Sequence, residues 1–587
     1  MNYELNAEQN KKKLSTLAGV RSLWPYLADE RGILLFAALA TIANSAINLS
    51  APLLIAHVVD TYIVAKQFHG VLLYAGILLV LYIVGLFTSY AQTRLMGGMG
   101  QRVLFNLRTK IFSKLQELPV AFFNANKAGD LISRINNDTD QLNQFFSRTL
   151  VQFIGSIVIM IGSGIFLLSI HLKLGAAALA PALGLLIFTQ LISPWVKRSN
   201  AVSLTATGGL SAEVSESLEN FKVVVAFNRR DFFRKRFEVA NDENYKTAMK
   251  AGIANNIFTP IYGFFANLAQ LIVLAYGVYL ISIGSFTLGL LVGFLSYIAS
   301  FYNPLRQLAS LWSSFQVALA GWDRVSAILQ MDNNMVVLPY ALEHARESKA
   351  LLEFKDVSFR YTEDKEVLHH INLTLEKGKT YALVGPTGGG KTTTASLMAR
   401  LYDPTDGAIF FEGRDIRTFD SVERTQKIGF ILQEPILFSG TVRENILYGN
   451  DSYKDFSNED LIKVLHDAEL ESLLVRFDGG LEAKVATSGD SLSLGQKQLI
   501  AFMRAVLRNP ELLILDEATA NIDTVTEQLL EDILKKLPKE TTRVIIAHRL
   551  NTIENADEIF FVNNGEVSLA GSMEHAVDML LHGKRES

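Results

Sequence analysis

Long runs of uncharged, mostly apolar residues dominate the first half of the chain. Asp, Glu, Lys and Arg are all absent from residues 33–59, 67–93, 149–172, 174–196 and 251–305. A helix needs about 20 apolar residues to span a membrane, so the last run is long enough for two spans. We therefore predict six transmembrane helices, near residues 33–54, 70–93, 150–170, 174–193, 261–281 and 287–305. The alternative, six helices buried in a large soluble protein, would need an unusually wide core.

Basic residues indicate how these helices are oriented. Lys and Arg are frequent before the first span and in the long segments after the second and fourth spans, whereas the opposite loops hold little more than Lys66 and Lys173. Basic loops stay on the cytoplasmic side. We therefore expect a multi-pass protein of a bacterial inner or plasma membrane, with its N-terminus and its C-terminal half in the cytoplasm.

Beyond residue 350 the pattern changes to alternating strand-like and helix-like runs, which is typical of an α/β domain. A chain of 587 residues is also too long for one core. We predict an all-α transmembrane domain at residues 1–330, a linker at 331–350 and an α/β domain at 351–587. Net charge is −4 and cysteine is absent, so the sequence offers no support for nucleic-acid binding and excludes thiolate chemistry.

One stretch of the second domain carries a phosphate-binding pattern. Residues 385–392 read Gly-Pro-Thr-Gly-Gly-Gly-Lys-Thr, between a strand-like and a helix-like run. Glycine-rich turns let backbone N–H groups surround phosphate oxygens, the lysine reaches the β- and γ-phosphates, and the hydroxyl of Thr392 can bind Mg²⁺. A chance glycine-rich turn is the alternative. The nucleotide-binding candidates here are Gly385, Pro386, Thr387, Gly388, Gly389, Gly390, Lys391, Thr392 and Thr393.

Two further segments complete a set of parts for phosphoryl transfer. Residues 512–517 read Leu-Leu-Ile-Leu-Asp-Glu, an apolar strand whose Asp516 is placed to hold Mg²⁺ and whose Glu517 is placed to activate water. Residues 492–496 read Leu-Ser-Leu-Gly-Gln before a helix-like run, which forms a second candidate anion site. An ordinary acidic turn and a simple Ser493 helix cap are the respective alternatives.

Together these motifs resemble the nucleotide-binding domain of ABC transporters, with an α/β P-loop NTPase fold. Residues 385–392 resemble the Walker A motif, 512–517 the Walker B motif and 492–496 the signature. The resemblance implies ATP and Mg²⁺ as cofactors and catalytic roles for Glu517, the switch histidine His548 and the Q-loop Gln433, which also approaches the metal. It further implies nucleotide contacts from Tyr361, Ser493, Gly495, Gln496 and the D-loop Asp523.

Six spans followed by one such domain resemble an exporter-type half transporter. In that family two chains pair head to tail, so that ATP lies between one Walker A motif and the other chain's signature. The resemblance implies an ATPase coupled to transmembrane transport by alternating access. Residues 119–138 and 213–230 resemble the loops that hold the coupling helices.

The sequence also departs from the family pattern. Leu494 stands where the signature usually has Gly, Gly389 where Ser is usual, and residues 484–490 lack the Glu common in exporters. Altered signatures are a feature of heterodimeric exporters but also occur in homodimers, so both kinds of partner chain remain open.

The cargo is less well defined by the sequence. The uncharged spans suit an amphipathic or lipophilic compound, and we expect export of a drug, lipid or peptide. An exporter-fold importer of an iron chelate and a non-transporting ABC channel or regulator are the alternatives. The six spans exclude a soluble ABC ATPase.

Overall fold

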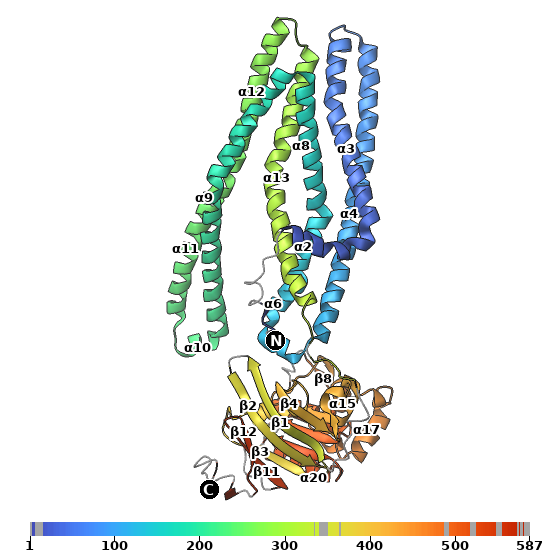
Figure 1. Cartoon of the computed structure of the whole chain (residues 1–587), viewed down its shortest axis with the longest axis vertical. Coiled ribbons are helices and arrows are strands. Elements are labelled where there is room, and N and C mark those ends of the chain that lie inside the picture. The colour runs from blue at the N-terminus through green and yellow to red at the C-terminus, as the bar shows by residue number, and fades with distance from the viewer. Residues whose placement is uncertain are drawn as a thin grey trace. The chain divides into compact units, whose positions relative to one another are not determined.

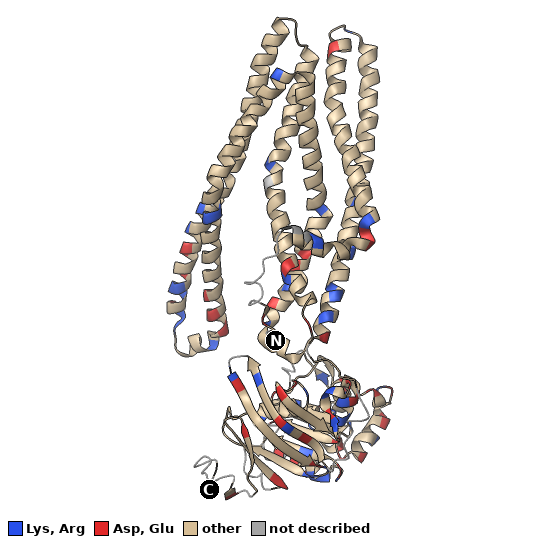
Figure 2. Cartoon of the chain, viewed as in Figure 1, with Lys and Arg blue, Asp and Glu red and all other residues tan. Residues whose placement is uncertain are grey.

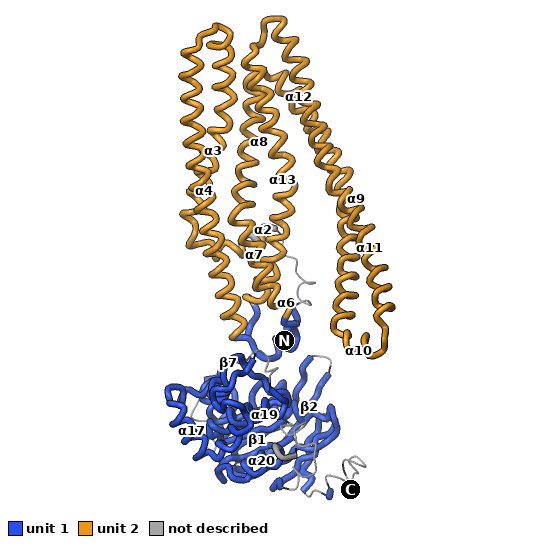
Figure 3. Tube along the Cα trace, turned by 180° about the vertical axis from the view of Figure 1, so that it is seen from behind, with its two compact units in different colours: residues 1–5, 117–128, 331–587 blue, residues 6–116, 129–330 orange. Residues whose placement is uncertain are grey.

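The computed structural model describes residues 3–5, 16–333, 335–339, 350–362, 365–486, 492–516, 524–546, 555–571, 574–575 and 579. The chain divides into two compact units (Figure 3). One holds residues 6–116 and 129–330, and the other holds residues 1–5, 117–128 and 331–587. The domain boundaries expected from composition stay predictions.

Long helices build the first unit (Figure 1). Six stretches are long and apolar enough to cross a membrane by length and composition: Arg21–Ile63, Phe68–Glu117, Ala128–Ile170, Leu172–Glu219, Arg230–Ser282 and Leu288–Leu329. Figure 2 shows few charged residues along the upper parts of these helices and many more in their lower parts. The predicted set of six apolar helices is confirmed.

The bounds of the helices in this unit and in the segment at 117–128 are as follows: α2 Thr16–Leu23, η1 Trp24–Glu30, α3 Arg31–Val58, η2 Val59–Ile63, α4 Phe68–Glu117, α5 Val120–Ala125, α6 Ala128–Ser133, η3 Arg134–Asp138, α7 Thr139–Gln144, η4 Phe145–Thr149, α8 Leu150–Ile170, α9 Leu172–Glu219, α10 Phe221–Ala226, α11 Arg230–Asn256, α12 Phe258–Ser282 and α13 Leu288–Leu329. Of these, η2, η3 and η4 are single π-helical turns.

Aromatic side chains hold part of the apolar helices together. Tyr297 on α13 stacks on Phe166 of α8 with ring centroids 5.3 Å apart, and its hydroxyl donates to the Leu49 carbonyl of α3. The hydroxyl of Tyr302 donates to the Ala178 carbonyl of α9 over 3.0 Å. Tyrosine hydroxyls need such partners when buried, so these bonds fix how α13 packs against α3 and α9.

Two larger sheets, one two-stranded sheet and a group of helices build the described part of the second unit. The strands are β1 Ala350–Thr362, β2 Lys365–Glu376, β3 Thr380–Val384, β4 Asp406–Phe411, β5 Arg414–Asp415, β6 Ile428–Ile431, β7 Gly440–Thr441, β8 Lys484–Val485, β9 Leu512–Asp516, β10 Thr542–Ile546, β11 Glu558–Asn563 and β12 Glu566–Leu569. The helices are α14 Lys391–Met398, η6 Ile416–Thr418, α15 Ser421–Lys427, α16 Val442–Ile446, η7 Asp451–Tyr453, α17 Asn458–Asp467, α18 Glu471–Leu474, η8 Gly480–Glu482, α19 Leu494–Val506 and α20 Thr524–Lys536.

The larger sheet has the order β12-β11-β3-β10-β9-β6, and the smaller one the order β2-β1-β4-β5. In the larger sheet β11, β3, β10, β9 and β6 are parallel, and β12 is antiparallel at the edge. The five residues of β9 are all buried, as expected for a parallel strand covered on both faces. This arrangement confirms the predicted α/β fold and brings the carboxyl ends of β3 and β9 to one edge.

The short helix α5 packs within this second unit. Phe122 is fully buried, and its ring meets that of Tyr3 edge-on, with centroids 6.5 Å apart. The side chain of Asn126 donates to the Tyr3 carbonyl over 2.8 Å. Asn124 donates to the hydroxyl of Tyr402 over 2.6 Å. Residues 117–128 are thus tied by specific contacts to residues far away in the sequence.

Candidate functional site

The glycine-rich loop joins the buried strand β3 to helix α14. Gly385 and Gly390 have φ angles of +145° and +114°, which favour glycine. A Cβ at Gly385 or at Gly389 would collide with the carbonyl oxygen of Val562 on β11. The glycine at 389, where the family usually has Ser, therefore fits the close approach of β11 in this chain.

Lys391 begins α14 and reaches back over the loop. Its side chain is 6% exposed, and its Nζ donates to the carbonyl oxygens of Gly385 over 2.8 Å and Pro386 over 3.0 Å. Gly390 provides no side-chain cap for the first N–H groups of the helix. An ammonium group and helix N–H donors therefore converge on the loop, which is the arrangement that binds phosphate.

Two oxygen ligands for a divalent cation meet beside this loop. The exposed hydroxyl of Thr392 donates to Oδ1 of Asp516 over 3.4 Å. Asp516 ends β9 and is only 2% exposed. A hydroxyl and a carboxylate on the phosphate side of a loop suit Mg²⁺, which takes oxygen ligands from protein, water and phosphate. The residues present therefore fit the metal that the motif implies.

Tyr361 forms an aromatic wall next to α14. Its hydroxyl hydrogen-bonds the hydroxyl of Thr393 over 3.0 Å, and its ring meets Tyr402 edge-on at 5.2 Å. Burial raises the pKa of the Tyr361 phenol, and the bond to Thr393 opposes that rise. Because 49% of the side chain is still exposed, the ring can take a planar base while both contacts hold it in place.

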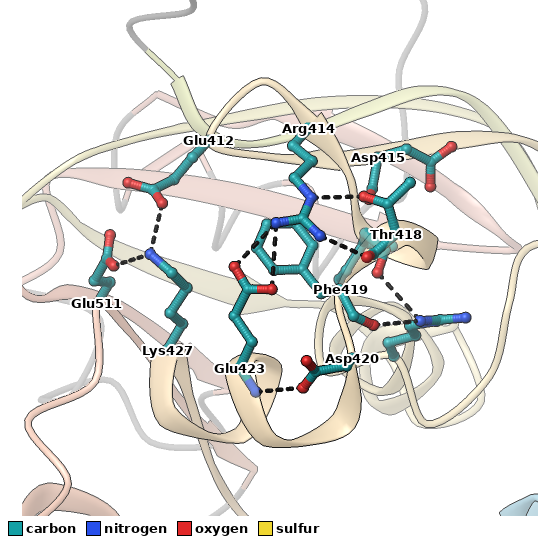
Figure 4. A network of polar contacts seen from close by, with 11 residues as sticks. Glu412, Arg414, Asp415, Thr418, Phe419, Asp420, Glu423, Lys427 and Glu511 are labelled. Carbon is teal, nitrogen blue, oxygen red and sulfur yellow. Dashed lines mark hydrogen bonds and ion pairs between the residues drawn. The ribbon is translucent and has the colours of Figure 1, made fainter. Parts of the chain in front are cut away.

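Gln433 follows β6 and is exposed. A polar network fixes α15, the helix that precedes β6 (Figure 4). Nζ of Lys427, the last residue of α15, lies 2.7 Å from an oxygen of Glu412 and 2.5 Å from an oxygen of Glu511. Burial opposes ionisation of Glu412, but hydrogen bonds from Lys377 and Lys427 outweigh it and lower the pKa of this carboxyl to about 2. The network thus anchors the segment that leads to Gln433.

The second candidate anion site lies at the start of α19. Ser493 and Gln496 form a capping box: Oγ of Ser493 accepts from the Gln496 N–H over 3.2 Å, and Oε1 of Gln496 accepts from the Ser493 N–H over 2.9 Å. Gly495 lies in the first turn of the helix, beside Leu494, which is 38% exposed. The buried face of α19 belongs to a different hydrophobic cluster from that of β3 and α14.

The structure therefore collects Tyr361, Thr393, Lys391, Thr392 and Asp516 around one loop. Three predicted site residues, Glu517, Asp523 and His548, lie outside the described residues, so their roles stay predictions.

Sequence reasoning missed Tyr402 and Asn124, which extend the wall of Tyr361. The bond between these two side chains joins positions 278 residues apart, and neither residue belongs to a spaced motif. The sequence therefore held no local signal that could have found them.

Comparisons with known proteins extend over almost the whole chain. A family described as "ABC transporter transmembrane region" matches residues 34–305, and one described as "ABC transporter" matches residues 368–520. The chain is 33% identical to a fatty acid ABC transporter ATP-binding/permease protein of Mycobacterium bovis, over 84% of this chain and 77% of that protein. It is 32% identical to a multidrug resistance ABC transporter ATP-binding and permease protein of Lactococcus lactis subsp. lactis, over 92% of this chain and 90% of that protein.

A solved structure of a bacterial Atm1-family ABC exporter with ATP bound has a similar fold. The TM-score is 0.77, and the match covers 95% of this chain and 99% of that one. The sequence identity is 24%, so this likeness supports the fold alone.

Proposed function

Because this chain belongs to the ABC transporter family, with a membrane region and an ATP-binding region of the exporter type in one polypeptide, we propose that it exports an amphipathic or lipophilic compound at the expense of ATP. The observation that carries the proposal is the meeting of Lys391, Thr392 and Asp516 at one loop, in a chain that also holds six membrane-length apolar helices. This arrangement can bind the phosphates of ATP and a Mg²⁺ ion that neutralises them.

Hydrolysis needs groups beyond the binding loop. Glu517 follows the metal-binding Asp516 directly in the sequence, and we assign it the task of orienting and deprotonating the attacking water. His548 and Gln433 assist at the γ-phosphate, and Asp523 contacts the nucleotide across the interface. Bound Mg²⁺ supplies charge neutralisation, while the residues of the chain position the phosphates and the water.

The separation of the two candidate anion sites supports the proposal that this chain works as a dimer. The phosphate loop and the start of α19 pack into different hydrophobic clusters, so each can serve a different nucleotide. In the proposed dimer the loop of one chain and Ser493, Gly495 and Gln496 of the other enclose each ATP. ATP then favours the closed pair because it binds that state more tightly than the open one.

The cargo proposal rests on the membrane helices and the relatives. The spans lack formal charge, which suits a lipophilic compound. The named relatives are a fatty acid transporter and a multidrug resistance transporter. Both come from bacteria, which supports a bacterial inner or plasma membrane, and the basic segments support cytoplasmic nucleotide-binding domains.

The test uses the full chain, purified and reconstituted in lipid vesicles, with Glu517→Gln as the control. We expect ATP-dependent accumulation of a fluorescent lipophilic dye or a fluorescent fatty acid in vesicles whose nucleotide-binding domains face outward. Glu517→Gln should bind ATP, hardly hydrolyse it and accumulate as a closed dimer. ATP-dependent release of an iron chelate from the lumen of these vesicles, which is the direction of an importer, or steady ion conductance without cargo movement, would overturn the proposal in favour of an importer or a channel.

A further inference from the structure

An apolar cavity of about 310 Å³ lies in the helical unit, and none of its lining residues belongs to the nucleotide-binding unit. Its walls come from the N-terminal helices, from the π-helical turn η4 and from α3, α7, α8 and α13. Every lining residue is Gly, Ala, Leu, Ile, Phe or Trp. Figure 1 shows α2 lying across the helices that form the other walls.

The indole N–H of Trp322, one of the two tryptophans in the cavity wall, is already engaged. Nε1 of Trp322 donates to Oγ of Ser22 over 2.8 Å, and the ring of Trp322 meets that of Tyr26 at 5.1 Å. On the other side, Phe145 of the π-helical turn packs against Phe315 at 5.3 Å. A water molecule needs two to four polar partners, so a cavity of this kind favours an apolar occupant over ordered water.

The cavity lies at the edge of the charge-free zone. Leu34 and Leu150 line it and are the second residues of the charge-free runs 33–59 and 149–172, whereas its lining residues on α13, Phe315, Ala318, Leu319 and Trp322, follow the end of the run 251–305. We therefore place the cavity at the level of the headgroup region, beside the start of the hydrocarbon. An occupant that enters from the membrane can therefore keep a polar head outside and place its chain inside.

A cation stands beside the cavity wall. The guanidinium of Arg31 lies 5.5 Å from the ring centroid of Trp24, which lines the cavity and is 49% exposed. The neighbouring carboxylate of Glu30 is already bound in a bidentate pair by Arg102, at 2.7 and 2.8 Å. Arg31 is exposed and can bind an anionic head with the planar fork geometry that suits a carboxylate.

We propose that this cavity binds the hydrocarbon chain of a single-chain anionic amphiphile, a long-chain fatty acid of the membrane, with its carboxylate on Arg31. Pockets for small molecules have volumes of about 300 to 1,000 Å³, and this cavity is at the lower end, with room for one chain and not two. The inference concerns binding alone and requires neither ATP nor transport.

Two of the four tryptophans, Trp24 and Trp322, line the cavity and can report on its occupant. We would replace Trp195 and Trp312 by Phe, reconstitute the full chain in nanodiscs of saturated phospholipid, and titrate dibromostearic acid, whose bromines quench tryptophan on contact, without nucleotide. We expect saturable quenching that unbrominated stearate reverses. Quenching that rises linearly and resists competition reports partition into the bilayer and would overturn the proposal.

Substitutions test where the hydrocarbon chain and the carboxylate of the fatty acid bind. Ala318 is 2% exposed and lines the cavity, so Ala318→Phe should fill it and remove the saturable quenching. The matched control Ala75→Phe lies on the exposed surface of α4 and should leave quenching unchanged. Arg31→Ala should raise the half-saturating concentration of the acid about tenfold, the loss expected for a hydrogen bond to a charged group, and should not affect dibromostearyl alcohol.

Other occupants give different results. Saturable quenching that appears only after residues 6–15 are deleted would identify the chain's own N-terminal segment and refute the fatty acid. Equal affinities for the acid and the alcohol, insensitive to Arg31→Ala, would refute the anionic head. The competition and headgroup measurements use variants other than Ala318→Phe, so they decide the matter even if that variant fails to fold. None of these measurements depends on ATPase activity. A failure of the transport proposal would therefore be distinguished from a failure of the fatty acid proposal.

Discussion

Replacing Lys391 by Ala tests the phosphate loop most directly. The side chain is almost fully buried, and its ammonium group is held by the carbonyl oxygens of Gly385 and Pro386 at 2.8 and 3.0 Å. These contacts hold the charge over the loop before a nucleotide arrives. When ATP binds, the same donors can turn to its β- and γ-phosphates.

The expected loss of ATP affinity follows from the hydrogen bonds that Lys391 would make to these phosphates. A hydrogen bond to a charged group contributes about 1.5 to 3 kcal/mol. Its loss would raise the dissociation constant for ATP about 10- to 150-fold. AMP lacks the β- and γ-phosphates, so its affinity should not change. The contrast separates a lysine that binds phosphate from one that only holds the loop in shape.

The assay is equilibrium binding of ATP and of AMP to the full chain in nanodiscs, with Mg²⁺ omitted so that hydrolysis does not interfere. Lys379→Ala is the matched control, because Nζ of Lys379 also has two partners, Glu376 and Glu558, at 2.9 Å each, but lies away from the loop. The control should bind both nucleotides normally. Equal losses for ATP and AMP in Lys391→Ala would refute the reasoning, since the lysine would then support the fold of the loop.

Four further substitutions test other parts of the structure. Leu494→Gly should raise ATPase activity, because it removes a partly exposed side chain from the start of α19; unchanged activity would show that the leucine is tolerated. Asn124→Ala and Tyr402→Phe each remove the 2.6 Å hydrogen bond that holds α5, at a cost of about 0.5 to 1.5 kcal/mol; hydrogen exchange of the α5 amides should quicken in each, and no further in the double variant. The pKa of Glu412 is lowered from 4.5 to about 2, so its stabilising contribution is fully present above 4.5 and is lost as the pH falls from 4.5 through about 2. Thermal unfolding of Glu412→Gln should therefore depend less on pH below 4.5, and an unchanged acid slope would contradict the assignment.

Local pattern was enough to predict the fold class. Five uncharged runs, the last long enough for two spans, indicate six membrane helices, because a helix satisfies every backbone group within its own segment. The glycine-rich loop could be predicted equally well, because Gly385, Gly390 and Lys391 all belong to one short segment that leads from β3 into α14. In both cases the physical constraint acts over a few consecutive residues.

Contacts between residues far apart in the sequence could not be predicted in the same way. Thr392 and Asp516 meet although 124 positions separate them, and only the resemblance to a family paired them in advance. No family resemblance paired Asn124 with Tyr402. The π-helical turn at Phe145–Thr149 leaves no mark in the hydrophobic pattern, and the cavity next to it collects residues from several separate helices. Such features depend on packing, which the order of residues does not reveal locally.

In the proposed dimer, the phosphate loop and the start of α19 of one chain contact different nucleotides. The effect of replacing Leu494 therefore depends on whether the dimer contains two identical chains. In the capping box, Oγ of Ser493 accepts from the backbone N–H of Gln496, and Oε1 of Gln496 accepts from the backbone N–H of Ser493. The hydroxyl of Ser493 and the N–H groups of Leu494 and Gly495 can therefore donate to a phosphate. Those donors face ATP held by the partner's loop, whereas Lys391 holds this chain's own ATP. In a homodimer, Leu494→Gly and Lys391→Ala would alter the same pair of equivalent sites. In a heterodimer they would alter two different sites, so that Leu494→Gly would still stimulate turnover when Lys391→Ala is present in the same chain. Steady-state ATPase rates of the single and double variants would therefore distinguish the two assemblies.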